Sequence, residues 1–170
     1  MKVLITYTSK YGSTAEIAEA IYNHLVERGI ETDFLEISEV IDVDVYSAFF
    51  IGSPIYNGSW TKQAQRFLKK NKELLSNKKV WLFSTGPIGK TNSAELLFEW
   101  KMPKKILSLA FGMNAIEVKI FPGYIQFEKL SVEDMDFFEK NGAPNIDSRN
   151  WNEIKLWSEK AATKLLANNS

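Results

Sequence analysis

Residues 2–14, KVLITYTSKYGST, constrain the fold more than any other part of the chain. Val3, Leu4 and Ile5 are branched and apolar without polar alternation, which is typical of a strand buried on both faces of a parallel sheet. A hydroxyl-rich loop with one glycine follows, and apolar residues then recur at helical spacing over residues 15–21. Backbone N–H groups and the helix dipole favour an anion at such a junction. Because four hydroxyls can add donors, the stretch predicts a bound phosphate.

A simpler interpretation of these hydroxyls is that Ser13 or Thr14 caps the helix. Two common nucleotide-binding loops do not fit the stretch. A Walker loop would have a glycine five residues before Gly12 and a lysine directly after it, and the chain has neither. A dinucleotide fingerprint would have glycines two and five residues after Gly12, and these are missing too.

Length and composition favour a single globular domain over residues 1–170. Lysine plus arginine and aspartate plus glutamate both total 21, so no net charge attracts the chain to nucleic acid or to an anionic membrane. The absence of cysteine excludes disulfides, thiolate metal sites and thiol catalysis, and we predict no metal site. No apolar run approaches the ~18 residues that span a bilayer, and no signal-like segment precedes the first strand. We therefore expect a cytoplasmic protein without integral membrane association.

Strands and helices are expected to alternate along the chain. After the strand and helix of the first stretch, the helix ending at Gly29, strands are expected over residues 32–37, 45–51, 78–84 and 115–120. Helices are expected over residues 60–75, 94–100, 104–112 and 150–167, with another that begins at Ser131 and is capped by its hydroxyl. This alternation implies right-handed crossovers and one parallel sheet covered on both faces.

Three unusual loops follow the first, third and fourth predicted strands. The first is the hydroxyl loop; residues 53–60 include Tyr56 and Trp60, and residues 85–91 are rich in glycine. Ligands of such sheets bind beyond the carboxyl ends of the strands, where the strand order reverses. A phosphate loop, an aromatic loop and a glycine-rich loop at one edge fit a flat heteroaromatic ring with a phosphate tail. Flavin mononucleotide (FMN) meets that description.

Residues 7–14, 51–56 (IGSPIY) and 84–87 (STGP) resemble the three cofactor loops of the flavodoxin-like FMN-binding family. The order of strands and helices is similar from residue 1 to about residue 121. The resemblance implies an α/β three-layer sandwich, with a five-stranded parallel sheet of order 2-1-3-4-5 and helices on both faces. It also implies non-covalently bound FMN and a role in electron transfer.

The resemblance further implies which residues bind each part of FMN. The phosphate is expected at Thr8, Ser9, Lys10, Tyr11, Gly12, Ser13 and Thr14. The ring is expected at Pro54, Ile55, Tyr56, Asn57, Gly58, Thr85, Gly86, Pro87, Ile88 and Gly89. Tyr56 and Trp60 can also be ordinary loop anchors or core residues, because aromatic side chains bury well in many places. No catalytic acid or base is identified.

Residues 84–91, STGPIGKT, end like a Walker loop directly after a strand. However, Ser84 replaces the first glycine and Pro87 removes a backbone donor. No apolar strand ends in an aspartate that would hold magnesium. Nucleotide hydrolysis is therefore disfavoured.

Two alternatives to an electron carrier remain. Residues 147–151 (DSRNW) with residues 53–56 are similar to flavodoxin-like protoporphyrinogen dehydrogenases, FMN-dependent oxidoreductases that pass electrons to a quinone. Residues 121–131 leave little room for the long insertion of those enzymes, and Trp151 and Trp157 are expected to pack the last helix. The other alternative is a flavin-free interaction module. Expected partners are a redox protein, a quinone or a small-molecule substrate, with a possible homodimer through apolar residues near Trp60, Phe98 and Trp100.

Overall fold

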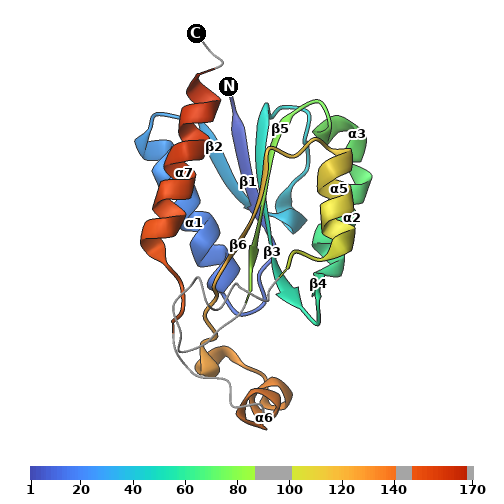
Figure 1. The fold of residues 1–170 in the computed structure, drawn as a ribbon, viewed down its shortest axis with the longest axis vertical. Coiled ribbons are helices and arrows are strands. Elements are labelled where there is room, and N and C mark those ends of the chain that lie inside the picture. Colours follow the sequence, from blue (N-terminus) through green and yellow to red (C-terminus); the bar gives the residue numbers. More distant parts are fainter. Residues whose placement is uncertain (87–100, 141–146, 168–170) are drawn as a thin grey trace.

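The computed structural model describes residues 1–86, 101–140 and 147–167, without the side chains of residues 137 and 138. Its centre is a sheet of five parallel strands in the order β2-β1-β3-β5-β6 (Figure 1). The strands are β1 Val3–Tyr7, β2 Thr32–Glu36, β3 Ala48–Tyr56, β5 Lys79–Thr85 and β6 Glu117–Phe121. A short strand, β4 Ser59–Trp60, pairs antiparallel with β3. Numbered along the chain, the five parallel strands have the predicted order 2-1-3-4-5, which is confirmed.

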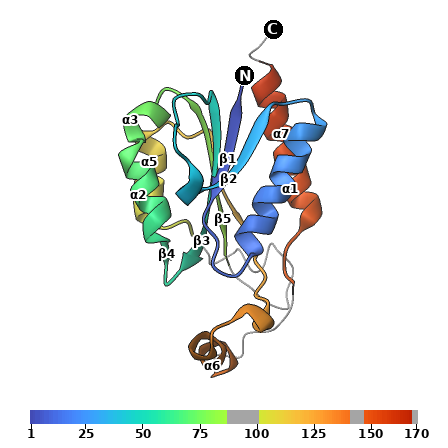
Figure 2. The same cartoon turned by 180° about the vertical axis from the view of Figure 1, so that it is seen from behind.

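Helices cover both faces of the sheet, as predicted (Figures 1 and 2). One layer contains α1 Ser13–Glu27 and α7 Trp151–Leu166, and the other contains α2 Lys62–Lys70, α3 Lys72–Leu75 and α5 Lys104–Gly112. The predicted helix over residues 60–75 begins two residues later, after its N-cap Thr61, and divides at Asn71. The helix predicted over residues 94–100 lies outside the described residues. Within the described part, no helix has the length and apolarity needed to cross a membrane.

Short elements lie along the remaining connections. The 3-10 helix η1 Ile37–Glu39 follows β2, while η2 Phe127–Lys129 and α6 Val132–Lys140 lie beyond the carboxyl ends of the strands (Figure 1). Ser131 Oγ accepts the backbone N–H of Asp134 at 3.2 Å, which confirms the predicted cap of α6.

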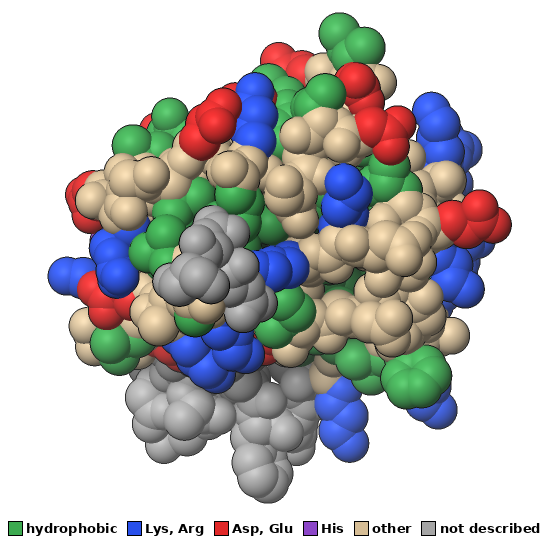
Figure 3. Space-filling view, turned by 90° about the horizontal axis from the view of Figure 1, so that it is seen from above, with side chains coloured by type: hydrophobic (Ala, Val, Ile, Leu, Met, Phe, Trp, Pro, Cys, Tyr) green, Lys and Arg blue, Asp and Glu red, His purple; other side chains and the backbone are tan. Residues whose placement is uncertain are grey.

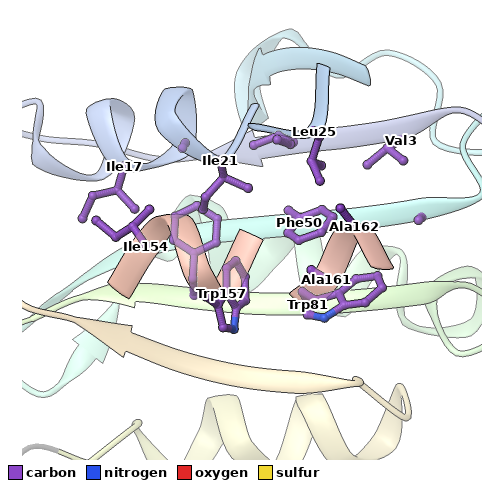
Figure 4. Close-up of a cluster of buried hydrophobic side chains, with 14 of the residues drawn as sticks. Val3, Ile17, Ile21, Leu25, Phe50, Trp81, Ile154, Trp157, Ala161 and Ala162 are labelled. Atoms are coloured by element: carbon purple, nitrogen blue, oxygen red, sulfur yellow. The ribbon is translucent and has the colours of Figure 1, made fainter. Parts of the chain in front are cut away.

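The core between the sheet and the α1–α7 layer follows the helical period of α1. Ile17, Ile21 and Leu25, spaced four residues apart, are fully buried, and Figure 4 shows them along one face of α1. Across the sheet, Phe50 stacks on Trp81 with ring centroids 4.8 Å apart, and Trp157 of α7 meets Phe50 edge-on at 5.7 Å. Trp157 is 5% exposed, so its predicted packing role is confirmed. These contacts fix α1, and hence the loop before it, against the sheet.

Strand β3 differs most from the sequence prediction. It continues past Ile51 to Tyr56, so Pro54, Ile55 and Tyr56 lie in a strand and the prediction of a loop there is wrong. Asn57 and Gly58, with φ of 48° and 68°, then turn the chain back into β4. An Asn-Gly pair favours this two-residue turn because both central residues adopt positive φ.

Gly52 directly follows the predicted end of this strand at residue 51, but it is an interior strand residue. It is paired in register with Phe83 of β5. A Cβ atom at Gly52 would lie 2.2 Å from Cζ of the Phe83 ring. The glycine is needed here because the ring lies over its backbone, as is common for glycines inside strands.

Candidate functional site

The candidate site lies at the carboxyl ends of β1, β3 and β5. The chain runs from β1 to β2 on one side and then crosses to β3 on the other side of β1, so the strand order reverses between β1 and β3. The loop of residues 8–12 leaves β1 at this reversal and leads into α1 (Figure 1). The fold therefore positions this loop where ligands of doubly wound sheets bind.

A cluster of hydroxyls joins the first loop to β3 and to the start of α2. Thr8 Oγ1 lies 2.8 Å from Thr61 Oγ1 and donates to Ser53 Oγ at 3.3 Å. The backbone N–H of Thr61 donates to the same Ser53 oxygen at 3.2 Å. A second link, between Thr14 Oγ1 and Thr85 Oγ1 at 2.8 Å, joins the start of α1 to the end of β5. The structure thus brings together residues from all three predicted loops.

No side chain caps the N-terminus of α1. Its N-cap residue is Gly12, with φ 91°, and no side-chain cap bond is formed. The Ser13 hydroxyl instead accepts the backbone N–H of Tyr124 at 3.1 Å, and the Thr14 hydroxyl is occupied by Thr85. The simpler interpretation of Ser13 and Thr14 as helix caps is therefore wrong. Backbone N–H groups in the first turn of a helix have no partner within the helix, so this terminus can accept an anion.

The ammonium group of Lys129, which was not expected from the sequence, lies beside this terminus. The ammonium of Lys10, which was expected there, is bonded to Asp134. Nζ of Lys129, from η2, lies 3.4 Å from the point at which a Cβ atom on Gly12 would sit. Glu16 Oε1 lies 3.5 Å from the same point, and its carboxylate receives bonds from Arg149 and Gln126. No local sequence signal could identify Lys129, because it is separated from the loop by more than one hundred residues.

Asp134 of α6 holds the first loop from outside the sheet. Its Oδ2 accepts hydrogen bonds from Lys10 Nζ at 2.8 Å, from the Tyr11 hydroxyl and from the Ser131 hydroxyl at 2.8 Å. The Lys10 ammonium, with these two hydroxyls, lowers the pKa of Asp134 to about 2. The same contact raises the pKa of Lys10. Asp134 is thus a carboxylate at neutral pH and connects α6 to the loop.

The two predicted aromatic loop residues have different positions. Tyr56 meets Tyr11 edge-on, with centroids 6.1 Å apart, and Lys10 Nζ lies 4.7 Å from the Tyr11 ring centroid. Burial raises the pKa of Tyr56. Trp60 is only 2% exposed and its indole N–H donates to Ser84 Oγ at 2.5 Å. Tyr56 therefore lies beside the first loop, whereas Trp60 is a core residue and forms no exposed dimer face. Phe98 and Trp100 lie outside the described residues.

Not every residue predicted from the sequence can be placed. Ser9 Oγ accepts the N–H of Gly12 at 3.1 Å, and the Gly86 N–H donates to the Phe121 carbonyl at 2.9 Å. Pro87, Ile88 and Gly89, with residues 90 and 91 of the Walker-like motif, lie outside the described residues. In the parts of the chain that are described, no cluster of histidine, aspartate and glutamate could hold a metal ion.

The segment 147–151 packs against the start of α1. The Arg149 side chain is 5% exposed and bonds the carboxylates of Asp147 and Glu16. Its guanidinium carbon lies 4.5 Å from the Trp151 ring centroid and 5.2 Å from that of Tyr124. These contacts give the segment a structural role beside the candidate site.

Five parallel strands in this order, covered by helices on both faces and with polar loops at the reversal point, define a doubly wound α/β protein of the flavodoxin type. The family model "Flavodoxin domain" matches residues 4–141, and the chain belongs to that family.

Individual proteins resemble the chain to different extents. The flavodoxin-like domain-containing protein BilS of Clostridioides difficile strain CD3 is 33% identical over 89 residues, which make up 50% of this chain and 47% of that protein. The match thus spans about half of this curated relative. A flavodoxin from the domain Archaea has a TM-score of 0.63 and 17% identity over 96% of this chain and 98% of its own. The Streptococcus pneumoniae TIGR4 flavodoxin has a TM-score of 0.62 and 16% identity over 96% of this chain and 99% of its own. At such identities the solved structures show the fold alone.

Proposed function

We propose that the chain binds FMN non-covalently at this site and serves as an electron carrier. The main observation in support is the N-terminus of α1, which no side chain caps and beside which the ammonium of Lys129 lies. Membership of the flavodoxin-domain family also supports FMN, because flavodoxin binds it between β1 and β3. The cofactor would supply the redox chemistry, and the chain would supply binding and orientation.

The donors present fit a phosphate monoester. Ser9 can direct a hydroxyl group, and Lys129 an ammonium group, to an anion at the first turn of α1. The nearby carboxylates of Glu16 and Asp134 already accept bonds from other side chains, which reduces their repulsion of a phosphate. The other residues named from the sequence are part of the same proposal: Thr8, Lys10, Tyr11, Gly12, Ser13 and Thr14 for the phosphate, and Pro54 to Gly58 with Thr85 to Gly89 for the ring.

A carrier fits the titratable groups better than an enzyme that moves protons. A general acid or base works best with a pKa near the working pH. Among the described residues at the first loop, Asp134 has a pKa of about 2, and burial raises the pKa of Tyr11 and Tyr56 above the ordinary tyrosine value. None of these groups is adjusted for proton transfer at neutral pH.

The decisive experiment is a titration of the full chain with FMN and with riboflavin, which has the same ring but no phosphate. We expect FMN to saturate at one per chain and riboflavin to bind at least about 10-fold more weakly, because the phosphate contacts are charge-assisted. Lys129→Gln should weaken FMN binding about 3-fold, the scale of an exposed charge contact, without changing riboflavin binding. Lys164→Gln, an exposed lysine in the last turn of α7, is the matched control. Absence of saturation with FMN would overturn the proposal.

Turnover separates the carrier from the alternatives. A carrier requires a reductase and a protein acceptor. An FMN-loaded chain that unaided oxidises protoporphyrinogen or reduces a quinone would instead be an oxidoreductase of the protoporphyrinogen dehydrogenase type. A colourless chain that takes up no FMN would indicate an interaction module.

A further inference from the structure

Positive charge is concentrated on one helix layer, although the whole chain is neutral. We use the term cationic layer for α2, α3 and α5 with the residues directly before α5. Over residues 62–75 and 101–112 this layer has one carboxylate, Glu73, and eight exposed basic side chains: Lys62, Arg66, Lys69, Lys70, Lys72, Lys101, Lys104 and Lys105. Charges of one sign gathered on one face produce a local potential that the net charge of the chain does not reveal.

Carboxylates of the described chain do not neutralise this layer. None of its eight basic side chains forms an ion pair with a described residue, whereas lysines near α7 are paired. Lys119 lies 2.6 Å from Glu153, and Lys160 lies 3.6 Å from Glu117. On the end of the molecule seen in Figure 3, acidic and basic side chains are interspersed. The cationic layer thus gathers, on one face, eight basic side chains that form no ion pair with a described residue.

The same layer has exposed apolar side chains on α5. Leu107 is 45% and Phe111 87% exposed, and four residues separate them, so they share one face of the helix. Ile106 and Ala110 occupy the buried face, against the sheet. Protein-binding surfaces typically combine an exposed aromatic residue with a rim of charged residues, as this surface does.

The cationic layer begins next to the candidate site. Lys62 directly follows Thr61, whose hydroxyl lies 2.8 Å from that of Thr8 in the first loop. The helices of this layer run opposite to the strands, so their amino ends lie at the carboxyl ends of the sheet (Figure 2). A protein bound at the amino ends of these helices would therefore lie close to the proposed FMN, and Phe111, at the carboxyl end of α5, would extend the contact away from it.

We propose that the cationic layer docks an acidic electron-transfer protein, with Phe111 and Leu107 as apolar contacts. The proposal rests on the proposed electron-carrier function, because a carrier must meet a protein with which it exchanges electrons. Charge complementarity selects an acidic surface, speeds the encounter and makes docking sensitive to salt.

The test uses a plant-type [2Fe–2S] ferredoxin, an acidic protein, as the probe. NMR of the ¹⁵N-labelled full chain follows its binding with or without FMN, so failure of docking and failure of FMN binding are seen separately. We expect shifts confined to α2, α3 and α5, and an apparent Kd that rises at least about 10-fold from ~20 to ~200 mM salt.

Two triple variants with equal net charge distinguish this layer from a general charge effect. The first variant carries Lys62→Glu, Lys104→Glu and Lys105→Glu and should abolish binding of the ferredoxin. The control variant on α7 carries Lys155→Glu, Lys160→Glu and Lys164→Glu, of which the first two also remove an ion pair, and it should retain most of the binding. Both variants should retain the far-UV circular dichroism of the parent chain.

Any of four results would overturn the proposal. One is that the ferredoxin fails to bind at low salt, and another is that the NMR shifts fall outside the cationic layer. The third is that the two triple variants weaken ferredoxin binding equally, and the fourth is that the layer prefers another kind of binding partner. The last is checked with duplex DNA, with vesicles containing phosphatidylserine, and by the concentration dependence of the chain's own sedimentation. Tighter binding to DNA or vesicles, or self-association lost in the first variant, would assign the surface to those occupants.

Discussion

Replacing Gly52 by alanine tests the packing that positions β3 beside the first loop. The new Cβ atom would lie 2.2, 2.5 and 2.8 Å from three atoms of the Phe83 ring. Ordinary contact begins near 3.4 Å, so the ring or the strand must move by more than 1 Å. Phe83 is fully buried and cannot turn into solvent.

The expected cost is at the upper end of the range for overpacked cores. Gly52→Ala should lower the free energy of unfolding by about 3 kcal/mol. For a chain of this length, that corresponds to a fall in Tm of roughly 6–12 °C. Urea denaturation of the full chain, followed by tryptophan fluorescence, measures the change. The Thr8 N–H donates to the Gly52 carbonyl at 3.0 Å, so FMN affinity should also fall if the strand rather than the ring moves.

A second substitution tests the steric explanation directly. Phe83→Leu alone should cost about 1–2 kcal/mol through lost packing. If the ring is the obstacle, a double variant with both Gly52→Ala and Phe83→Leu should lose less stability than the two single variants lose together. The difference in the free energy of unfolding should be at least about 1 kcal/mol. Additive effects, or a Gly52→Ala variant within about 0.5 kcal/mol of the parent chain, would refute the reasoning.

Three further predictions follow from the site. Gly58→Ala and Gly29→Ala both place a side chain at positive φ, 68° and 72°, in open space, so each should cost about 1 kcal/mol of stability. Only Gly58→Ala should change FMN affinity, and equal effects of both on FMN titrations would argue against a role of this turn. Trp60→Phe should cost about 1 kcal/mol in urea denaturation, because Ser84 loses the indole N–H; an unchanged midpoint would count against that bond. The pKa of Asp134 is depressed to about 2, so its contribution to holding α6 is complete above pH ~4 and lost as the pH falls towards 2. Hydrogen exchange of α6 should therefore accelerate over that range in the parent chain but not in Asp134→Asn, and parallel profiles would disprove the tether.

Much of the fold follows from local sequence patterns. The apolar run at Val3, the helical spacing of Ile17, Ile21 and Leu25, and the glycine at the end of α1 are local signals, and the structure agrees with each. The alternation of elements predicted one parallel sheet covered on both faces, because crossovers are right-handed, and the resemblance to the flavodoxin-like family added the strand order. The first loop could be recognised for the same reason, since strand, turn and helix are adjacent in the chain.

Local signals failed where a residue's role depends on a distant partner. Gly52 and Pro54 resemble strand breakers, yet the ring of Phe83 and the register with β5 hold them in β3. The burial of Trp60 depends on Ser84, and this pairing was not visible in the sequence.

The sequence by itself determined the doubly wound sheet and the loop at the start of α1, because both arise from hydrophobic periods and turn residues within short stretches. Only the tertiary structure showed that Lys129 and Asp134 meet that loop, and that the basic residues of α2 and α5 form one layer. The physical reason is that electrostatic and hydrogen-bond contacts depend on distances in space. Packing sets those distances between residues that lie far apart in the chain.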